Sequence, residues 1–254
     1  MSKIEVSNFA KFGNEHYSAS TLNLFSKSIG NFVMEKLIGV RLPVGAAAHR
    51  GRAVEDGLAA ILQYGERVEH AKALGVERFD QYSAMCTDPK RDAEREAVAG
   101  CIEQGYQQLI QWGTPDIIQE KIEWRHPDLP LPFIGFIDFG WTKHKRIIDL
   151  KAQLRLSSSI DETHARQIAL YNASKGWDWT SGISYVSPKK GATYQLENGE
   201  QHLNALVRIA KAMERYLSWS DVAEHYIDIT APDFDSFYWN DPAARRAGFQ
   251  LWGY

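Results

Sequence analysis

Two carboxylates and an ammonium group interrupt apolar stretches near the middle of the chain. Asp138 lies within GFIDFG, Asp149 lies within IIDL, and Lys151 follows Asp149 by two residues. Residues two apart in an extended strand share a face, so the side chains of Asp149 and Lys151 are expected to point the same way. Charges in such apolar surroundings indicate either a chemical site or a structural ion pair.

The segment TKHK between the two apolar runs predicts a hairpin turn centred between Lys143 and His144. An antiparallel hairpin folded there pairs residues whose numbers add up to 287, so Asp138 faces Asp149 with about 5 Å between their Cβ atoms. Two opposed carboxylates repel each other, and burial adds to that cost. A positive group is therefore expected between them, either Lys151 or a divalent cation. Oxygen ligands without His or Cys favour Mg²⁺ or Mn²⁺ over zinc.

A third carboxylate interrupts a helical apolar stripe upstream. Glu55 stands between Val54 and Leu58 in RGRAVEDGL. His49 competes with Glu55 as a ligand, but a separation of six residues turns it about 120° around the helix, so the two do not serve one site. The alternative for Glu55 is a solvated ion pair with Arg52.

Downstream, Gln167 and Tyr171 are four residues apart, and His164 precedes Gln167 by three. This spacing places all three on one face of a helix. The alternative is an amphipathic helix whose tyrosine covers the core.

The elements that would position these residues follow from periodicity. Apolar spacing and capping residues predict helices over residues 18–39, 45–65, 91–113, 161–176 and 201–217. Runs rich in β-branched and aromatic residues predict strands over 116–126, 132–141, 146–153, 181–188 and 191–199. This order predicts an α/β (α+β) fold with a central mixed β-sheet flanked by helices.

Composition narrows the classes of protein. The net charge of −3 argues against a protein that coats nucleic acid over its whole surface, but it allows a local basic groove. No apolar run approaches the roughly 20 residues that span a bilayer, and the first residues do not resemble a secretory signal. The two cysteines are too few for a four-cysteine zinc or iron–sulfur site, and they are expected to be reduced thiols in a cytoplasm.

Taken in order, SASTLNLFSKSIGNFV, RGRAVEDGL, GFIDFG, IIDLK and QIALY resemble the PD-(D/E)XK nuclease superfamily, and most closely its RecB-type and lambda-exonuclease-like branch. The resemblance covers about residues 18–190. It implies a single nuclease domain over 1–254 with a restriction-endonuclease-like core. A C-terminal helix and an aromatic tail then occupy residues 200–254.

The resemblance implies a role for each matching residue. Glu55, Asp138, Asp149 and the main-chain carbonyl of Leu150 would hold Mg²⁺ or Mn²⁺, and Lys151 would act at the scissile phosphate. Gln167 and Tyr171 match the Q-x-x-x-Y helix of this branch. The candidates for phosphate contacts are the basic residues near these motifs, namely Arg50, Arg52, Lys143, Lys145, Arg146, Arg155 and Arg166. For the basic run around the turn, a solvated hairpin face is the alternative.

The implied function is a Mg²⁺-dependent DNA exonuclease in recombination, repair or phage DNA processing. Its partners would be DNA and, as a candidate, a single-strand annealing or recombination protein. The chain departs from the family pattern in having Ile137 before Asp138, where the name-giving proline would stand, and Glu55 where many RecB-type members have His. Its aromatic tail resembles those of phage-encoded members, which would place the protein in a host cytoplasm. An endonuclease, an inactive nucleic-acid-binding module of the same fold, and a non-nuclease protein with a structural Asp–Lys pair remain alternatives.

Overall fold

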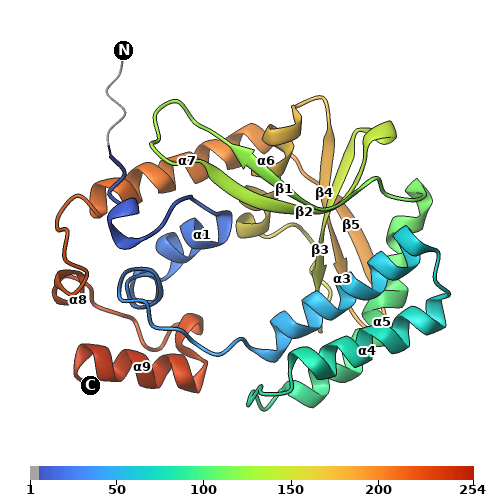
Figure 1. The fold of residues 1–254 in the computed structure, drawn as a ribbon, viewed down its shortest axis with the longest axis horizontal. Coiled ribbons are helices and arrows are strands. Elements are labelled where there is room, and N and C mark those ends of the chain that lie inside the picture. The colour runs from blue at the N-terminus through green and yellow to red at the C-terminus, as the bar shows by residue number, and fades with distance from the viewer. Residues whose placement is uncertain (1–5) are drawn as a thin grey trace. The chain divides into compact units, whose positions relative to one another are not determined.

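The computed structural model describes residues 6–254, whose helices and strands are labelled in Figure 1. These residues form two compact units. Unit 2 comprises Val44–Lys121 and Phe136–Gly199, and unit 1 comprises the remaining described residues up to Pro43, Ile122–Gly135 and Glu200–Tyr254. The segment predicted as a C-terminal helix and aromatic tail falls entirely in unit 1. Every sequence-predicted site residue falls in unit 2.

The sheet has five strands in the order β1-β2-β3-β4-β5. These strands are β1 (Ile117–Trp124), β2 (Phe133–Trp141), β3 (Arg146–Ala152), β4 (Thr180–Val186) and β5 (Gly191–Gln195). Strand β3 pairs antiparallel with β2 and parallel with β4, and β4 pairs antiparallel with β5. The parallel pair is joined through a helix, as a parallel connection requires. The sheet is therefore mixed, and the fold class is α/β with flanking helices, as predicted.

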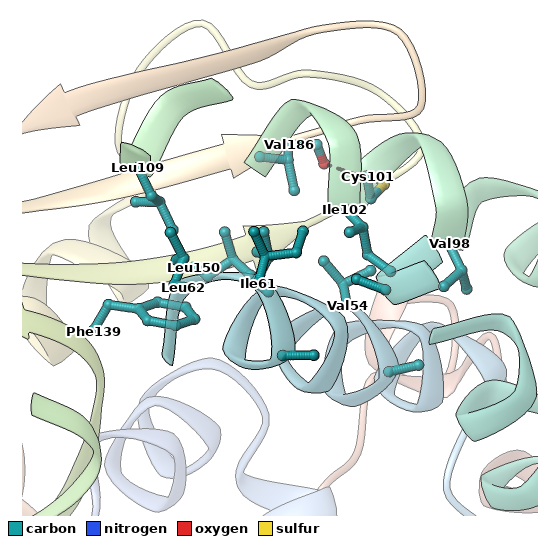
Figure 2. Packing of buried hydrophobic residues seen from close by; sticks show 14 of the residues in the cluster. Val54, Ile61, Leu62, Val98, Cys101, Ile102, Leu109, Phe139, Leu150 and Val186 are labelled. Atoms are coloured by element: carbon teal, nitrogen blue, oxygen red, sulfur yellow. Dashed lines mark hydrogen bonds between the residues drawn. The ribbon is translucent and has the colours of Figure 1, made fainter. Parts of the chain in front are cut away.

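The helices of unit 2 are α3 (Ala46–Tyr64), α4 (Val68–Tyr82), α5 (Arg91–Leu109) and α6 (Glu162–Lys175). Helices α3, α4 and α5 pack against one another, and α3 and α5 also contact the sheet. Figure 2 shows their shared core, where Val54 and Ile102 from two helices lie near Leu150 of β3. Because alternate side chains of a strand point to opposite faces, Leu150 in this core directs Asp149 and Lys151 to the other face of β3.

Unit 1 contains α1 (Ala19–Lys27), α2 (Ile29–Phe32), a π-helical turn (Val33–Leu37), α7 (Gly199–Tyr216), α8 (His225–Asp228) and α9 (Pro242–Trp252). Its half-buried carboxylate Glu214 accepts hydrogen bonds from Tyr17 Oη at 2.5 Å and Ser7 Oγ at 2.6 Å. A small apolar cluster of Met34, Trp239 and Ala244 packs near α9.

All five strands were predicted from the sequence to within a few residues, whereas the helices were predicted less completely. Helix α4 was missed, because its buried positions include Ala71 and Gly75, which give no bulky apolar stripe. The single helix predicted over 18–39 is wrong, since Ser28 leaves helical geometry and ends α1. Within the part of the chain that the structure describes, every helix is too short or too polar to cross a lipid bilayer.

Gly100 of α5 allows this helix to pack closely against the main chain at Pro188. A Cβ atom at Gly100 would overlap the main chain of Pro188, which cannot rotate away as a side-chain tip can. Gly51 of α3 offers a matched control, because a Cβ there meets nothing within 4 Å.

We expect Gly100→Ala to lower the free energy of unfolding by about 1–3 kcal/mol through overpacking. Gly51→Ala should raise it by up to about 1 kcal/mol, because alanine favours the helix. Urea unfolding of both variants measures the difference, and equal effects would contradict the packing of α5 on Pro188.

Candidate active site

The β2–β3 hairpin has the register predicted from the sequence. Phe139 pairs with Ile148 and Trp141 with Arg146, so the numbers add up to 287 in each pair. Continued by one residue, this register sets Asp138 opposite Asp149. Asp138 Oδ2 also accepts a hydrogen bond of 2.7 Å from the backbone N–H of Leu150. The two aspartates are therefore held on neighbouring strands by the backbone itself.

Asp149 is the most buried carboxylate of this group, with 1% of its surface exposed. Lys151 Nζ lies 2.8 Å from Asp149 Oδ2, and the two form an ion pair along the strand. Among residues 6–254, no donor makes a well-directed hydrogen bond to either carboxylate oxygen of Asp149. A buried carboxylate normally accepts several hydrogen bonds, so these oxygens have unused capacity for a further positive group.

Glu55 of α3 is connected to Asp138 by Gln119, a residue that was not predicted from the sequence. The amide Nε2 of Gln119 donates to Glu55 Oε2 at 3.2 Å and to Asp138 Oδ1 at 3.1 Å. Gln119 lies in β1, where its φ of 49° falls in the left-handed region that non-glycine residues rarely adopt. A polar residue in an otherwise strand-like run was the only sequence signal for it.

The carboxylates perturb one another. Burial and the neighbouring Asp149 raise the pKa of Glu55 to about 7, although Lys151 opposes the shift. Burial, followed by repulsion from Asp149 and Glu55, raises the pKa of Asp138 well above its ordinary value. Burial lowers the pKa of Lys151, but attraction to Asp149 and Asp138 outweighs burial, so its pKa is raised and it stays protonated. The cluster is thus rich in acids that resist ionisation while no cation is bound.

Helix α6 contributes the predicted glutamine and tyrosine. Gln167 Nε2 donates to Tyr171 Oη at 2.8 Å. Tyr171 is buried, and burial together with repulsion from Asp149 raises its pKa to about 12. The phenol therefore remains neutral beside the carboxylates. His164, the third residue of that helix face, instead lies 2.8 Å through Nδ1 from the hydroxyl of Tyr185.

One predicted phosphate contact requires correction. Arg50 is only 4% exposed, pairs with the buried Glu94 of α5, and donates to the carbonyl of Ala152 at 2.8 Å. Its place on the inner face of α3, four residues after the buried Ala46, explains this burial. Arg50 fixes α3 and α5 to the end of β3 and cannot contact a phosphate from this position.

The other basic candidates are exposed or partly exposed residues of unit 2. Several of them contact an aromatic ring or an acidic side chain. Arg52 stacks over Tyr82 with its Cζ 4.1 Å from the ring centroid, and Arg146 stacks over Trp112 at 4.8 Å. Lys145 pairs with Asp178, and Arg166 pairs with Glu162 at 2.8 Å. Lys143 and Arg155 are exposed. Their contact with DNA stays a prediction.

A pocket of about 550 Å³ opens beside the carboxylates. Glu55 of α3 and Gln119 of β1 are part of its wall, together with Arg52 and Phe139. Solvent therefore reaches the cluster from this side, whereas Asp149 is closed off. The pocket supplies a route by which an ion or a small substrate could approach Glu55.

Among residues 6–254, no three His, Cys, Asp or Glu side chains are already arranged to hold a metal ion. The Gln119 amide donates a hydrogen bond to Glu55 and to Asp138. The donor set nevertheless suits a hard cation, because it consists of carboxylate and carbonyl oxygens and includes the oxygens of Asp149, which accept no well-directed hydrogen bond from residues 6–254. The residues present therefore fit Mg²⁺ or Mn²⁺.

No protein-family description and no curated protein matches this chain. A solved structure described as "Crystal structure of SSO0001" is similar at 14% sequence identity, covering 88% of this chain and 95% of that one, with a TM-score of 0.36. This distant similarity adds nothing to the assignment of the site.

The pKa of Glu55 predicts how stability depends on pH without metal. Its folded-state pKa of about 7 lies above the ordinary value of 4.5, so the folded state binds more protons between these values. The free energy of unfolding should therefore fall as pH rises from about 4.5 to about 7. Glu55→Gln should flatten part of this decline in urea titrations with chelator.

Glu197→Gln, a change at an exposed glutamate of unit 2, should leave the pH profile unchanged. Identical profiles for wild type and Glu55→Gln would contradict the raised pKa of the partly buried Glu55.

Proposed function

We propose that this chain is a Mg²⁺- or Mn²⁺-dependent deoxyribonuclease of the PD-(D/E)XK type, acting as an exonuclease on phosphodiester bonds. The observation that carries the proposal is the cluster itself. Asp138 and Asp149 lie on the two strands of one hairpin, Lys151 forms an ion pair with Asp149, and Glu55 approaches from α3. Among residues 6–254, no donor makes a well-directed hydrogen bond to the buried oxygens of Asp149. A purely structural Asp–Lys pair requires neither the second aspartate nor the glutamate.

Glu55, Asp138, Asp149 and the carbonyl of Leu150 would hold the cation. When bound, such an ion lowers the pKa of a coordinated water and offsets charge that builds on the phosphoryl oxygens. Asp138 is positioned for this role by the Leu150 N–H, which fixes its carboxylate orientation.

Lys151 acts as an electrostatic group. Its raised pKa keeps the ammonium protonated, so it stabilises negative charge on the phosphate in the transition state and does not serve as a general base. Its side chain is 26% exposed, and its Nζ is held by Asp149. Gln167 and the neutral Tyr171 phenol would position the nucleotide next to this ammonium.

The wider biological context follows from the sequence resemblance alone. It favours the RecB-type and lambda-exonuclease-like branch, a role in recombination, repair or phage DNA processing, and action in the cytoplasm of a cell or host. DNA is the proposed substrate, and a single-strand annealing or recombination protein is a proposed partner. Arg52, Lys143, Lys145, Arg146, Arg155 and Arg166 remain the candidates for phosphate contacts.

The decisive measurement is the release of acid-soluble nucleotides from end-labelled linear DNA with Mg²⁺. We expect chelation to abolish release, and Asp149→Asn or Lys151→Met to lower the rate by about 100-fold or more, because the first weakens a proposed ligand of the cation and the second removes a positive charge beside the reacting phosphate. Lys189→Met, at an exposed lysine of the same unit, should retain activity. Melting curves verify that each variant is folded.

Activity that survives chelation, or that survives both substitutions in folded protein, would exclude the proposed mechanism. Closed circular DNA separates the alternatives. An exonuclease spares it and an endonuclease linearises it, while an inactive binding module retains DNA on a filter and cleaves neither form.

A further inference from the structure

Gln119 has three features that its position in β1 does not explain. Its amide nitrogen bridges two acidic side chains, its backbone has a left-handed φ, and its residue surface is exposed. A left-handed φ at a residue other than glycine costs about 1–2 kcal/mol. The backbone is therefore strained at Gln119, whose amide forms the bridge.

The bridge joins carboxylates from different elements. Glu55 comes from α3 and Asp138 from β2, and the amide nitrogen lies within 3.2 Å of an oxygen of each. Both partners are acceptors, so the nitrogen end of the amide must face them, with its positive N–H groups directed into the gap.

We propose that the Gln119 side chain is a built-in substitute for the cation. In the metal-free protein it bridges Glu55 and Asp138, and it would leave when these residues hold a divalent cation. This inference rests on the proposed cation-dependent function. Gln119 is a positioning residue here, since it acts through the carboxylates and does not touch the substrate.

Competition follows from electrostatics. The positive ends of the N–H dipoles and a divalent cation cannot share one narrow gap between the same oxygens without repulsion. Space for the displaced side chain exists, because Gln119 forms part of the wall of the pocket of about 550 Å³ beside Glu55. An exposed side chain also moves at little packing cost, unlike the buried Asp149 and Tyr171.

The bridge predicts two effects of opposite sign in Gln119→Ala. Without metal, the variant should melt at a lower temperature than wild type, because the two carboxylates lose a shared donor. Its affinity for Mn²⁺ should be about 5- to 10-fold higher, because the cation no longer displaces an amide worth about one net hydrogen bond. Titration calorimetry with Mn²⁺ alone measures the affinity, and differential scanning calorimetry with chelator measures the melting temperature.

Gln81→Ala is the matched control, because the exposed Gln81 also donates its amide to a glutamate, Glu77 Oε1, at 3.0 Å. It should leave Mn²⁺ affinity unchanged. In the double variant Gln119→Ala/Glu55→Gln, the changes in metal-free stability should not be additive, because both substitutions remove the same hydrogen bond.

The outcomes separate this inference from the function on which it rests. Wild-type protein that binds Mn²⁺ with an affinity equal to or higher than that of Gln119→Ala would overturn the inference and leave the function standing. Additive effects of the two substitutions on metal-free stability would also overturn it. Protein that binds no Mn²⁺ in any of these forms would overturn both.

Discussion

The candidate site depends on one constraint, the antiparallel register of β2 and β3. That register pairs Phe139 with Ile148 and so brings Asp138 opposite Asp149, while the Leu150 N–H donates to Asp138 across the same hairpin. A shift of one residue would turn every side chain of the strand to the opposite face. Because the apolar side chains of both strands enter the core shared with α3 and α5, such a shift would bury charge and expose that core. Packing of the apolar face therefore holds the acids in place on the other.

The third carboxylate is held by a different device. Glu55 belongs to a helix whose position relative to β3 is fixed by the buried Arg50, which joins Glu94 of α5 to the carbonyl of Ala152 just after Lys151. Removing one partner of a buried ion pair leaves an uncompensated charge, so this link is sensitive to single substitutions. It lies on α3, α5 and β3, which are three of the elements that contribute to the apolar core in Figure 2. One arginine thus links the helix that bears Glu55 to the end of the strand that bears Lys151.

Sequence reasoning predicted the strands and the hairpin register because alternation and turn residues are local signals. It predicted Asp138, Asp149 and Lys151 as neighbours for the same reason, and their ion pair and opposed geometry are present. Arg50 was misassigned because its burial depends on Glu94, which lies 44 positions away and becomes a partner only after α3 packs on α5. Gln119 was missed because its role depends on side chains of α3 and β2 and on an unusual φ. Helix α4 was missed because small residues, which permit close packing, give a weak periodic signal.

These observations together describe a cluster that is electrostatically unfavourable while no cation is bound. Raised pKa values at Glu55 and Asp138 show that the protein favours protons where ionised acids would repel. Lys151 forms an ion pair with Asp149 only, and the oxygens of Asp149 accept no well-directed hydrogen bond from the described residues. The N–H dipoles of the uncharged Gln119 amide offset part of the remaining repulsion between Glu55 and Asp138. Proteins retain such an arrangement at a stability cost when the same charges act on a ligand, because perturbed, mutually repelling acids are typical of functional sites. The resulting loss of stability affects unit 2, and the packing of its helices and sheet offsets that loss.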